Sequence, residues 1–160
     1  MMKLGSYGPY GLVLYIHSII RWLVLAAGAY ALLRTWRGRL GGRPWEKADG
    51  LAARVFVSVM DLQLLVGIIL YGIFSPAVAG GFMQPEIALP SRGLRFWMIE
   101  HPLAAVVAVA LAHVGYLKAK KGGANAHRDA SLFFTLAVVI VLAALPWPIF
   151  SYGRALWPTW

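Results

Sequence analysis

The chain has 160 residues, of which 60% are hydrophobic and only 13% are charged, and it carries a net charge of +9 and no cysteine. Charged residues make up roughly a quarter of an average soluble domain, so this composition excludes an ordinary soluble protein and predicts an integral membrane protein. The lack of cysteine excludes disulfides, thiolate metal sites and covalent attachment of a c-type haem.

Four apolar runs are predicted to be membrane-spanning helices, over residues 8–33, 51–74, 94–117 and 130–150. Each run is near or above the ~20 residues that cross the hydrocarbon layer of a bilayer. The first run is too long for the core of a cleaved signal peptide, and it contains His17 and Arg21, so we interpret it as a helix of the mature protein. The predicted fold is all-α: one domain over residues 1–160, an antiparallel four-helix membrane bundle.

Basic residues indicate the orientation of this bundle. The two connections expected on one side contain Arg34, Arg37, Arg39, Arg43, Lys47 and Arg54, and Lys118, Lys120, Lys121 and Arg128, whereas the other side has Lys3, Arg92, Arg95 and Arg154. The positive-inside rule then places both termini and the 75–92 loop on the outer, periplasmic side of a bacterial inner membrane. Because cationic inner loops that face anionic lipid explain the net charge, no nucleic-acid partner is expected.

The first run carries an arginine in its middle, in the stretch "YIHSIIRWL". At about 1.5 Å per residue, Arg21 lies roughly 19 Å below the outer end, and Asp61, counted from Phe74, lies roughly 19 Å deep in the second run. We therefore predict that Arg21 and Asp61 pair, with Gln63 and Ser18 as neighbours. Two interpretations stay open: a structural ion pair that fixes helix register, or a direct role as proton relay or quinone contact.

Two histidines are expected at similar depths on different helices. His17 lies roughly 13 Å and His101 roughly 10 Å below the outer end, and the first and third helices of an up-down bundle are diagonal. Two neutral imidazoles that face each other across a bundle can hold a b-type haem as axial ligands. Because Pro102 disfavours α conformation at the residue before it, His101 is expected at a kink or just ahead of the helix start.

Other polar residues complete the predicted sites. Arg92 and Arg95 are candidates to meet haem propionates, with contacts to lipid headgroups as the alternative. Glu100 is expected to join the buried polar network. His113 and His127 are the candidates for a second haem, the alternative being an interfacial histidine and a residue at a helix N-terminus.

The segments "HSIIRWLVL", "DLQLLVGIILY", "RFWMIEHP" and "PWP" are similar to small bacterial four-helix membrane proteins labelled cytochrome b-like, and they more distantly resemble the b561-type membrane cytochromes. The resemblance implies a b-type haem, with His17 and His101 as the matching histidines, and electron exchange with quinone or a periplasmic partner. Some relatives have a histidine near the position of Asp61, so this chain departs from the pattern in the second helix, and a haem ligand from that helix is not expected.

Three functional hypotheses remain from the sequence. The first is a membrane electron carrier with one haem b, whose partners are the lipid bilayer, a quinone, and a periplasmic redox protein or larger membrane complex. The second is a haem-free accessory or scaffold subunit, in which His17, Arg21, Asp61 and Glu100 form a structural network. The third is a small metal transporter that binds copper through His17, His101 and Met83 or Met98, although the five methionines are scattered. Each is compatible with a homo-oligomer, and none is fixed as an enzyme.

Overall fold

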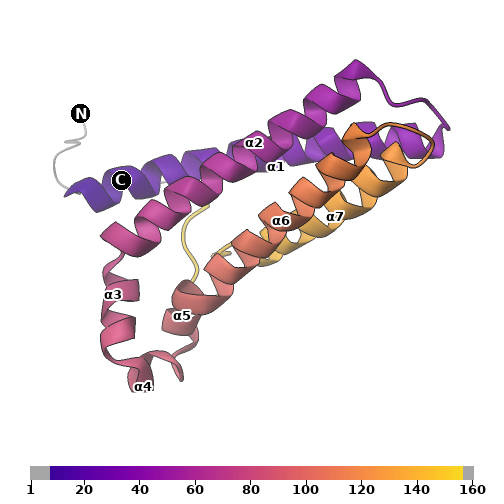
Figure 1. Cartoon of the computed structure of the whole chain (residues 1–160). Helices are drawn as coiled ribbons and strands as arrows, with labels where there is room; N and C mark the ends of the chain where they lie inside the picture. Colours follow the sequence, from indigo (N-terminus) through magenta and orange to yellow (C-terminus); the bar gives the residue numbers. More distant parts are fainter. Residues whose placement is uncertain (1–7, 157–160) are drawn as a thin grey trace.

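The computed structural model describes residues 8–156, and these residues form helices joined by loops, with no strand among them (Figure 1). Lys3, Trp157 and Trp160 lie outside the described residues. The helices in chain order are α1 Gly8–Leu40, α2 Lys47–Ile69, α3 Pro76–Met83, α4 Pro85–Ala88, α5 Arg92–Arg95, α6 His101–Lys120 and α7 Ala126–Ala143. Two π-helical segments, η1 Leu70–Phe74 and η2 Phe96–Glu100, continue α2 and precede α6.

Four of the helical stretches are long and apolar enough to cross a membrane, as predicted: Gly8–Leu40, Lys47–Phe74, Arg92–Lys120 and Ala126–Ala143. The fourth is shorter than expected, because α7 ends at Ala143 and not near residue 150. Pro146 and Pro148 explain the difference, since proline lacks a backbone N–H and disfavours the α conformation in the residue before it. The chain from Ala144 to Leu156 is instead an irregular segment, which we call the C-terminal segment.

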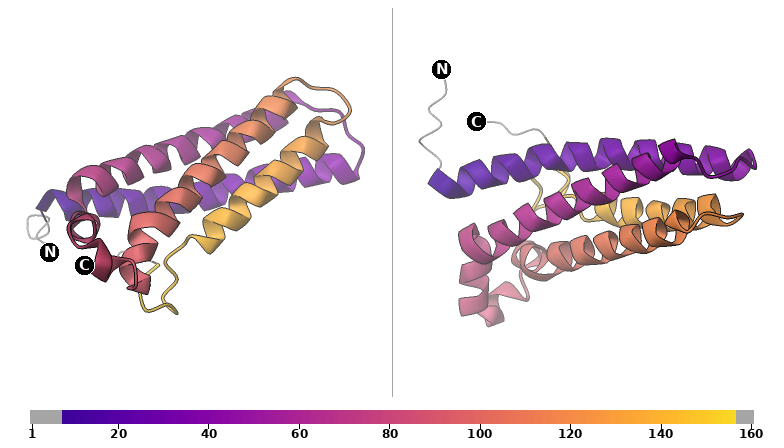
Figure 2. Two further views of the ribbon diagram at one scale, coloured as in Figure 1. Left: turned by 60° about the horizontal axis from the view of Figure 1, so that its bottom comes forward. Right: turned by 45° about the horizontal axis from the view of Figure 1, so that its top comes forward.

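The long helices form two hairpins, α1–α2 and α6–α7. Helix α1 packs against α2 and α7, and α6 packs against the same two helices, so α1 and α6 are diagonal, as predicted. The hairpins meet at the end that carries the 41–46 and 121–125 loops and separate toward the other end, where α3, α4 and α5 connect them (Figures 1 and 2). We call these the basic-loop end and the α3–α5 end.

Small side chains allow close packing of the helices. Ala31, Ala53, Ala108 and Ala137 are fully buried, as expected where membrane helices associate without a hydrophobic driving force. A few large groups fill the remaining space: the rings of Phe56 and Phe134 meet edge to face, with centroids 5.3 Å apart. A Cβ on Gly28 would lie 3.0 Å from Phe56 and 3.1 Å from Val138, so this glycine is required by helix packing.

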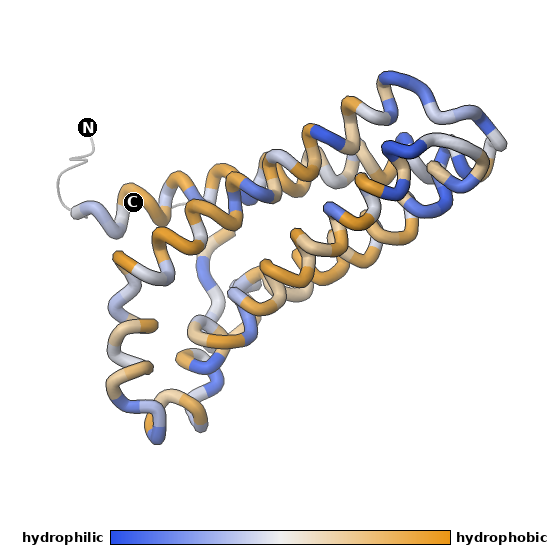
Figure 3. Tube along the Cα trace, in the orientation of Figure 1, coloured by the Kyte–Doolittle hydropathy of each residue, from blue (hydrophilic) through white to orange (hydrophobic). Residues whose placement is uncertain are grey.

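The outside of the bundle is predominantly apolar. Leu65 and Ile68 of α2, Leu103 of α6 and Val139 of α7 are each more than half exposed, on surfaces that a lipid bilayer would cover. Hydrophilic residues are concentrated at the basic-loop end, and a smaller number lie around α3–α5 (Figure 3). This pattern is typical of a multi-pass membrane protein.

Candidate functional site

A pocket of about 230 Å³ lies between the two hairpins near the α3–α5 end. Its wall comes mainly from α1, α2, η1, α6 and the C-terminal segment, which passes between the hairpins, and α3, η2 and α7 contribute one residue each (Figure 1). Most lining side chains are apolar. The polar exceptions that matter below are His17, Arg21, Gln63, His101 and Arg154. An apolar pocket with a few convergent polar groups is the usual form of a binding site for a small molecule or cofactor.

His17 from α1 and His101 from α6 meet in this pocket. Their ring centroids are 6.3 Å apart and the rings are inclined at 69°. An imidazole nitrogen binds a transition-metal ion at roughly 2 Å, so the separation of the two rings leaves room for one ion between them. The two histidines that the depth argument placed at a similar level are therefore close together in the structure.

His101 is held by a hydrogen bond in the orientation and tautomer of a metal ligand. Its Nδ1 lies 2.9 Å from the carbonyl oxygen of Ala144, and because a carbonyl only accepts, Nδ1 carries the proton and donates. Nε2 then keeps its lone pair, the state that metal binding requires. His101 has α conformation despite Pro102 after it, with φ −65° and ψ −50°, so the expected departure from the helix at this residue is not observed. The irregularity is instead the π-helical segment η2 directly before His101, and such segments are frequent at functional sites.

His17 is contacted by Gln63 of α2, whose Nε2 lies 3.1 Å from His17 Nε2. Two atoms of this pair are buried without a hydrogen-bond partner among the described residues, His17 Nδ1 and Gln63 Oε1. With the side-chain amide turned by 180°, Gln63 would accept from Nε2–H, and Nδ1 would become the free lone pair. Gln63 therefore controls which nitrogen of His17 is available as a ligand.

A small residue beside His17 keeps the pocket open. A Cβ added to Gly67 of α2 would lie 3.3 Å from Cε1 and 3.8 Å from Nδ1 of His17. Ala105, on α6, also lines the pocket. A larger side chain at Gly67 would occupy the space next to the His17 ring.

The predicted pair of Arg21 and Asp61 is wrong. Arg21 instead donates from Nη2 to the carbonyl oxygen of Leu156 in the C-terminal segment. Asp61 is exposed, with Oδ2 lying 3.5 Å from His113 Nε2 on α6. The two residues were correctly judged to be deep in their helices, but Asp61 is two residues from Gln63, or about 200° around α2, and so faces away from the pocket.

The prediction for Glu100 is also wrong, and Arg92 and Arg95 lie outside the pocket. Arg95 pairs with Glu100 at 2.8 Å on the exposed surface, so Glu100 is not part of a buried network. The Arg92 guanidinium lies over the rings of Phe150 and Tyr152. Neither arginine lines the pocket.

Arg154, unlike Arg92 and Arg95, is close to the two histidines of the pocket. It lines the pocket, donates to the Tyr10 hydroxyl at 3.2 Å and lies 4.3 Å from the ring centroid of Trp97. In the sequence analysis, Arg154 served only as one of the basic residues from which the membrane orientation was predicted. No local motif could have placed it, because its position depends on how the C-terminal segment folds back after Pro146.

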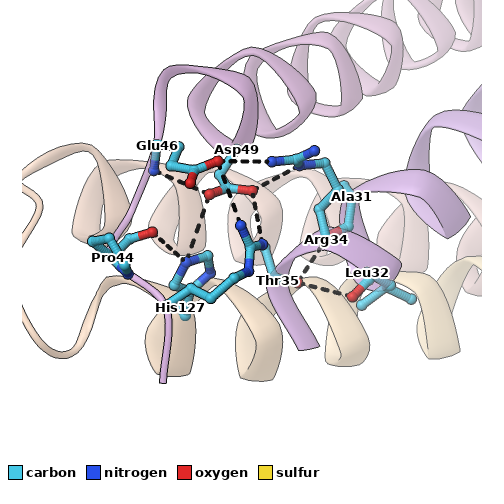
Figure 4. A network of polar contacts seen from close by, with 9 residues as sticks. Ala31, Leu32, Arg34, Thr35, Pro44, Glu46, Asp49 and His127 are labelled. Carbon is cyan, nitrogen blue, oxygen red and sulfur yellow. Dashed lines mark hydrogen bonds and ion pairs between the residues drawn. The ribbon is translucent and has the colours of Figure 1, made fainter. Parts of the chain in front are cut away.

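A second polar cluster, at the basic-loop end, was missed from the sequence (Figure 4). Asp49 of α2 is fully buried and accepts a 2.7 Å bond from Arg34 Nε and a 3.0 Å bond from the backbone N–H of Glu46. Arg43 lies 3.9 Å from the same carboxylate, and His127 Nε2 lies 3.6 Å from it. We call these five residues the Asp49 cluster.

His113 and His127, the candidates for a second haem, do not come together, and His127 lies in the first turn of α7, as the alternative interpretation predicted. His127 belongs to the Asp49 cluster, with its Nε2 3.3 Å from the Pro44 carbonyl oxygen, and its ring packs against Trp45. His113 contacts Asp61 and donates from Nδ1 to the carbonyl oxygen of Val109. The two histidines thus have separate partners on different parts of the bundle.

The donor set of the pocket suits haem better than a free metal ion. The described residues contain no cluster of three or more His, Cys, Asp or Glu that could hold a metal. Met83 is exposed on α3, Met98 is buried against Gly81, and neither lines the pocket, so the soft ligands expected for copper do not join the histidines. Two imidazoles in apolar surroundings, one with an unpartnered buried nitrogen, do fit a b-type haem.

In comparisons with protein-family models, curated proteins and solved structures, none matches this chain.

Proposed function

We propose that this chain is a membrane-embedded b-type haem electron-transfer protein that holds one haem through His17 and His101. The observation that carries the proposal is the meeting of two imidazoles, from the diagonal helices α1 and α6, in an otherwise apolar pocket. Haem bound there would supply a one-electron redox couple at its iron.

The chain's own residues would position the ligands and keep water away. The Ala144 carbonyl oxygen fixes the tautomer of His101, and the orientation of the Gln63 amide decides which nitrogen of His17 carries the proton. Apolar side chains such as Leu14 and Val109 line the pocket and lower its polarity. Such surroundings tune the potential of a bound redox group.

The proposed setting is a bacterial inner membrane, with the α3–α5 end and both termini on the periplasmic side. Supporting this orientation, the 41–46 and 121–125 loops lie at one end and are flanked by most of the basic residues. Electrons would then be exchanged near the periplasmic surface, with a quinone, a periplasmic redox protein or a larger membrane complex. A homo-oligomer is compatible with this setting.

The test is a reduced-minus-oxidised absorption spectrum of the purified protein in detergent, with a pyridine haemochrome assay for stoichiometry. We expect a b-type α band at one haem per chain. His17→Ala should abolish it because a ligand is lost, whereas His113→Ala, a matched change outside the pocket, should retain it. A colourless wild-type protein from haem-replete cells, or full haem retention by His17→Ala, would refute the proposal.

The alternative is a haem-free accessory subunit of a membrane complex. Exposed apolar side chains at the α3–α5 end favour it, since Phe82, Met83 and Ile87 are all more than half exposed. Such a surface suits a partner subunit as well as lipid. A colourless, folded protein that copurifies with a defined membrane complex would support this function over the first.

A further inference from the structure

The pocket has an unbalanced charge. Arg21 and Arg154 line it, and none of the described lining residues is an aspartate or a glutamate. A charged side chain inside a membrane protein normally pairs with an opposite charge, because an unpaired one in apolar surroundings is costly. The pocket therefore suits an occupant that carries negative charge.

Arg21 is the more deeply placed of the two cations. It is only 8% exposed, and within the described chain its Nη2 donates to a backbone carbonyl while its Nε is buried without a hydrogen-bond partner. Its guanidinium also lies 5.7 Å from the ring centroid of Trp22. None of these contacts neutralises the positive charge.

Arg154 is similar. Its described partners are the Tyr10 hydroxyl and the face of Trp97, both of which are uncharged. The ion pairs within residues 8–156 use other arginines, as when Arg34 meets Asp49 and Arg95 meets Glu100. Two arginines from segments far apart in sequence thus reach the same pocket, and both retain donors for an acidic group.

We propose that Arg21 and Arg154 form an anion subsite that binds the propionate carboxylates of the haem. This inference rests on the proposed function. The planar guanidinium is well matched to a carboxylate, and such charge-assisted bonds are about twice as strong as neutral ones. One haem molecule would use all three features of the pocket. Its macrocycle would contact the apolar wall, its iron the two imidazoles and its propionates the two guanidiniums. The subsite would fix which edge of the macrocycle faces the C-terminal segment.

The experiment compares ferric haem with haem dimethyl ester, in which both propionates are esterified. Haem-free full-length protein in neutral detergent is titrated with each, and binding is followed by the Soret band and by quenching of tryptophan fluorescence. We expect the diester to bind about tenfold or more weakly, as the loss of one charge-assisted hydrogen bond implies. Equal affinity of the two compounds in the wild-type protein would overturn the inference.

Variants then assign the effect to residues. Arg154→Gln should weaken binding of haem by about tenfold and leave binding of the diester unchanged. Arg92→Gln removes the same charge at the same end outside the pocket and should change neither. An equal loss in both variants would mean that general surface charge, not this subsite, attracts the propionates. Because Arg21 is buried, Arg21→Gln can prevent folding. The test therefore depends on the comparison of haem with its diester and on Arg154→Gln, which do not require the Arg21 variant.

The outcomes separate this inference from the proposed function. In one outcome, haem and the diester bind equally and both lose the six-coordinate spectrum in His17→Ala. The proposed haem protein would then stand, and the anion subsite would be refuted. If neither compound binds the folded protein, the proposed function and the anion subsite are both refuted. An anionic phospholipid is the other source of acidic oxygens. If esterification leaves haem affinity unchanged but added anionic lipid lowers it, the arginines bind lipid headgroups and the inference is overturned.

Discussion

The Asp49 cluster and the histidine pocket both contain polar side chains deep in the bundle, but their hydrogen bonding differs. At the basic-loop end, both oxygens of the Asp49 carboxylate have partners, and Arg34 and His127 converge on them. At the other end, His17, Arg21 and Gln63 each have a buried atom without a partner among the described residues. His127 Nδ1 of the Asp49 cluster is also buried without a partner, so the clearer difference is in charge. The Asp49 carboxylate is paired with Arg34 and Arg43, whereas no acidic residue among the described pocket lining faces Arg21 or Arg154. A buried charge is tolerated when it is paired, and an unpaired one calls for an explanation such as a bound group. Burial alone would not distinguish the two regions.

The largest effect is expected from breaking the Asp49 cluster. Asp49→Ala would leave Arg34 and His127 without their shared buried carboxylate, and removing one partner of a buried pair costs about 3–5 kcal/mol. Thermal unfolding in detergent, followed by circular dichroism, measures the loss. Haem content per folded molecule should not change, because the cluster and the pocket lie at opposite ends. A variant as stable as the wild type would show that this cluster does not hold the hairpins together.

A smaller effect on stability is expected in the pocket. Gln63→Leu removes an amide that is only partly hydrogen-bonded, and replacing such a group by an apolar one of similar size should change stability by less than about 1 kcal/mol. The redox potential of the proposed haem should shift, because the hydrogen-bond partner of His17 is lost. Potentiometric titration and chemical denaturation of the same sample test both statements. Destabilisation as large as that of Asp49→Ala, with an unchanged potential, would contradict the contrast between the two regions.

The smallest effect is expected outside both regions. Asp61→Asn alters an exposed pair with His113, and a substitution away from cavities and buried networks usually changes stability by about 0.5 kcal/mol or less. The same unfolding assay applies, with Asp49→Ala as the reference. A strong loss in Asp61→Asn would mean that the lipid-facing pair is buried by another chain, and a dependence of stability on protein concentration would then identify an oligomer.

The sequence predicted the helices and the histidine pair for physical reasons that are simple. Hydropathy and length determine which segments can cross a membrane, and depth along a helix follows from a constant rise per residue. These two rules were enough to bring His17 and His101 to one level on diagonal helices. They placed the end of the last helix too late, because α7 ends at Ala143, ahead of Pro146 and Pro148.

What the sequence missed depends on direction around a helix and on irregular chain. Arg21 and Asp61 were matched by depth without regard to the face of α2 on which Asp61 lies. The Asp49 cluster joins residues from α1, the 41–46 loop, α2 and α7, and no spacing rule links them; the nearest signal was Glu46 three residues before Asp49 at a helix start. Arg154 reaches the pocket only because the C-terminal segment turns back between the hairpins.

That segment has a consequence for the order of events during biosynthesis. Residues 144–156 leave the ribosome after all four long helices, and they supply Ala144, Leu145, Pro146 and Arg154 to the pocket wall. A nascent chain with every helix already inserted therefore still lacks one side of the site, including the carbonyl oxygen that orients His101. Any occupant of the pocket can therefore meet its complete wall only after residues 144–156 have been made and have folded back between the hairpins.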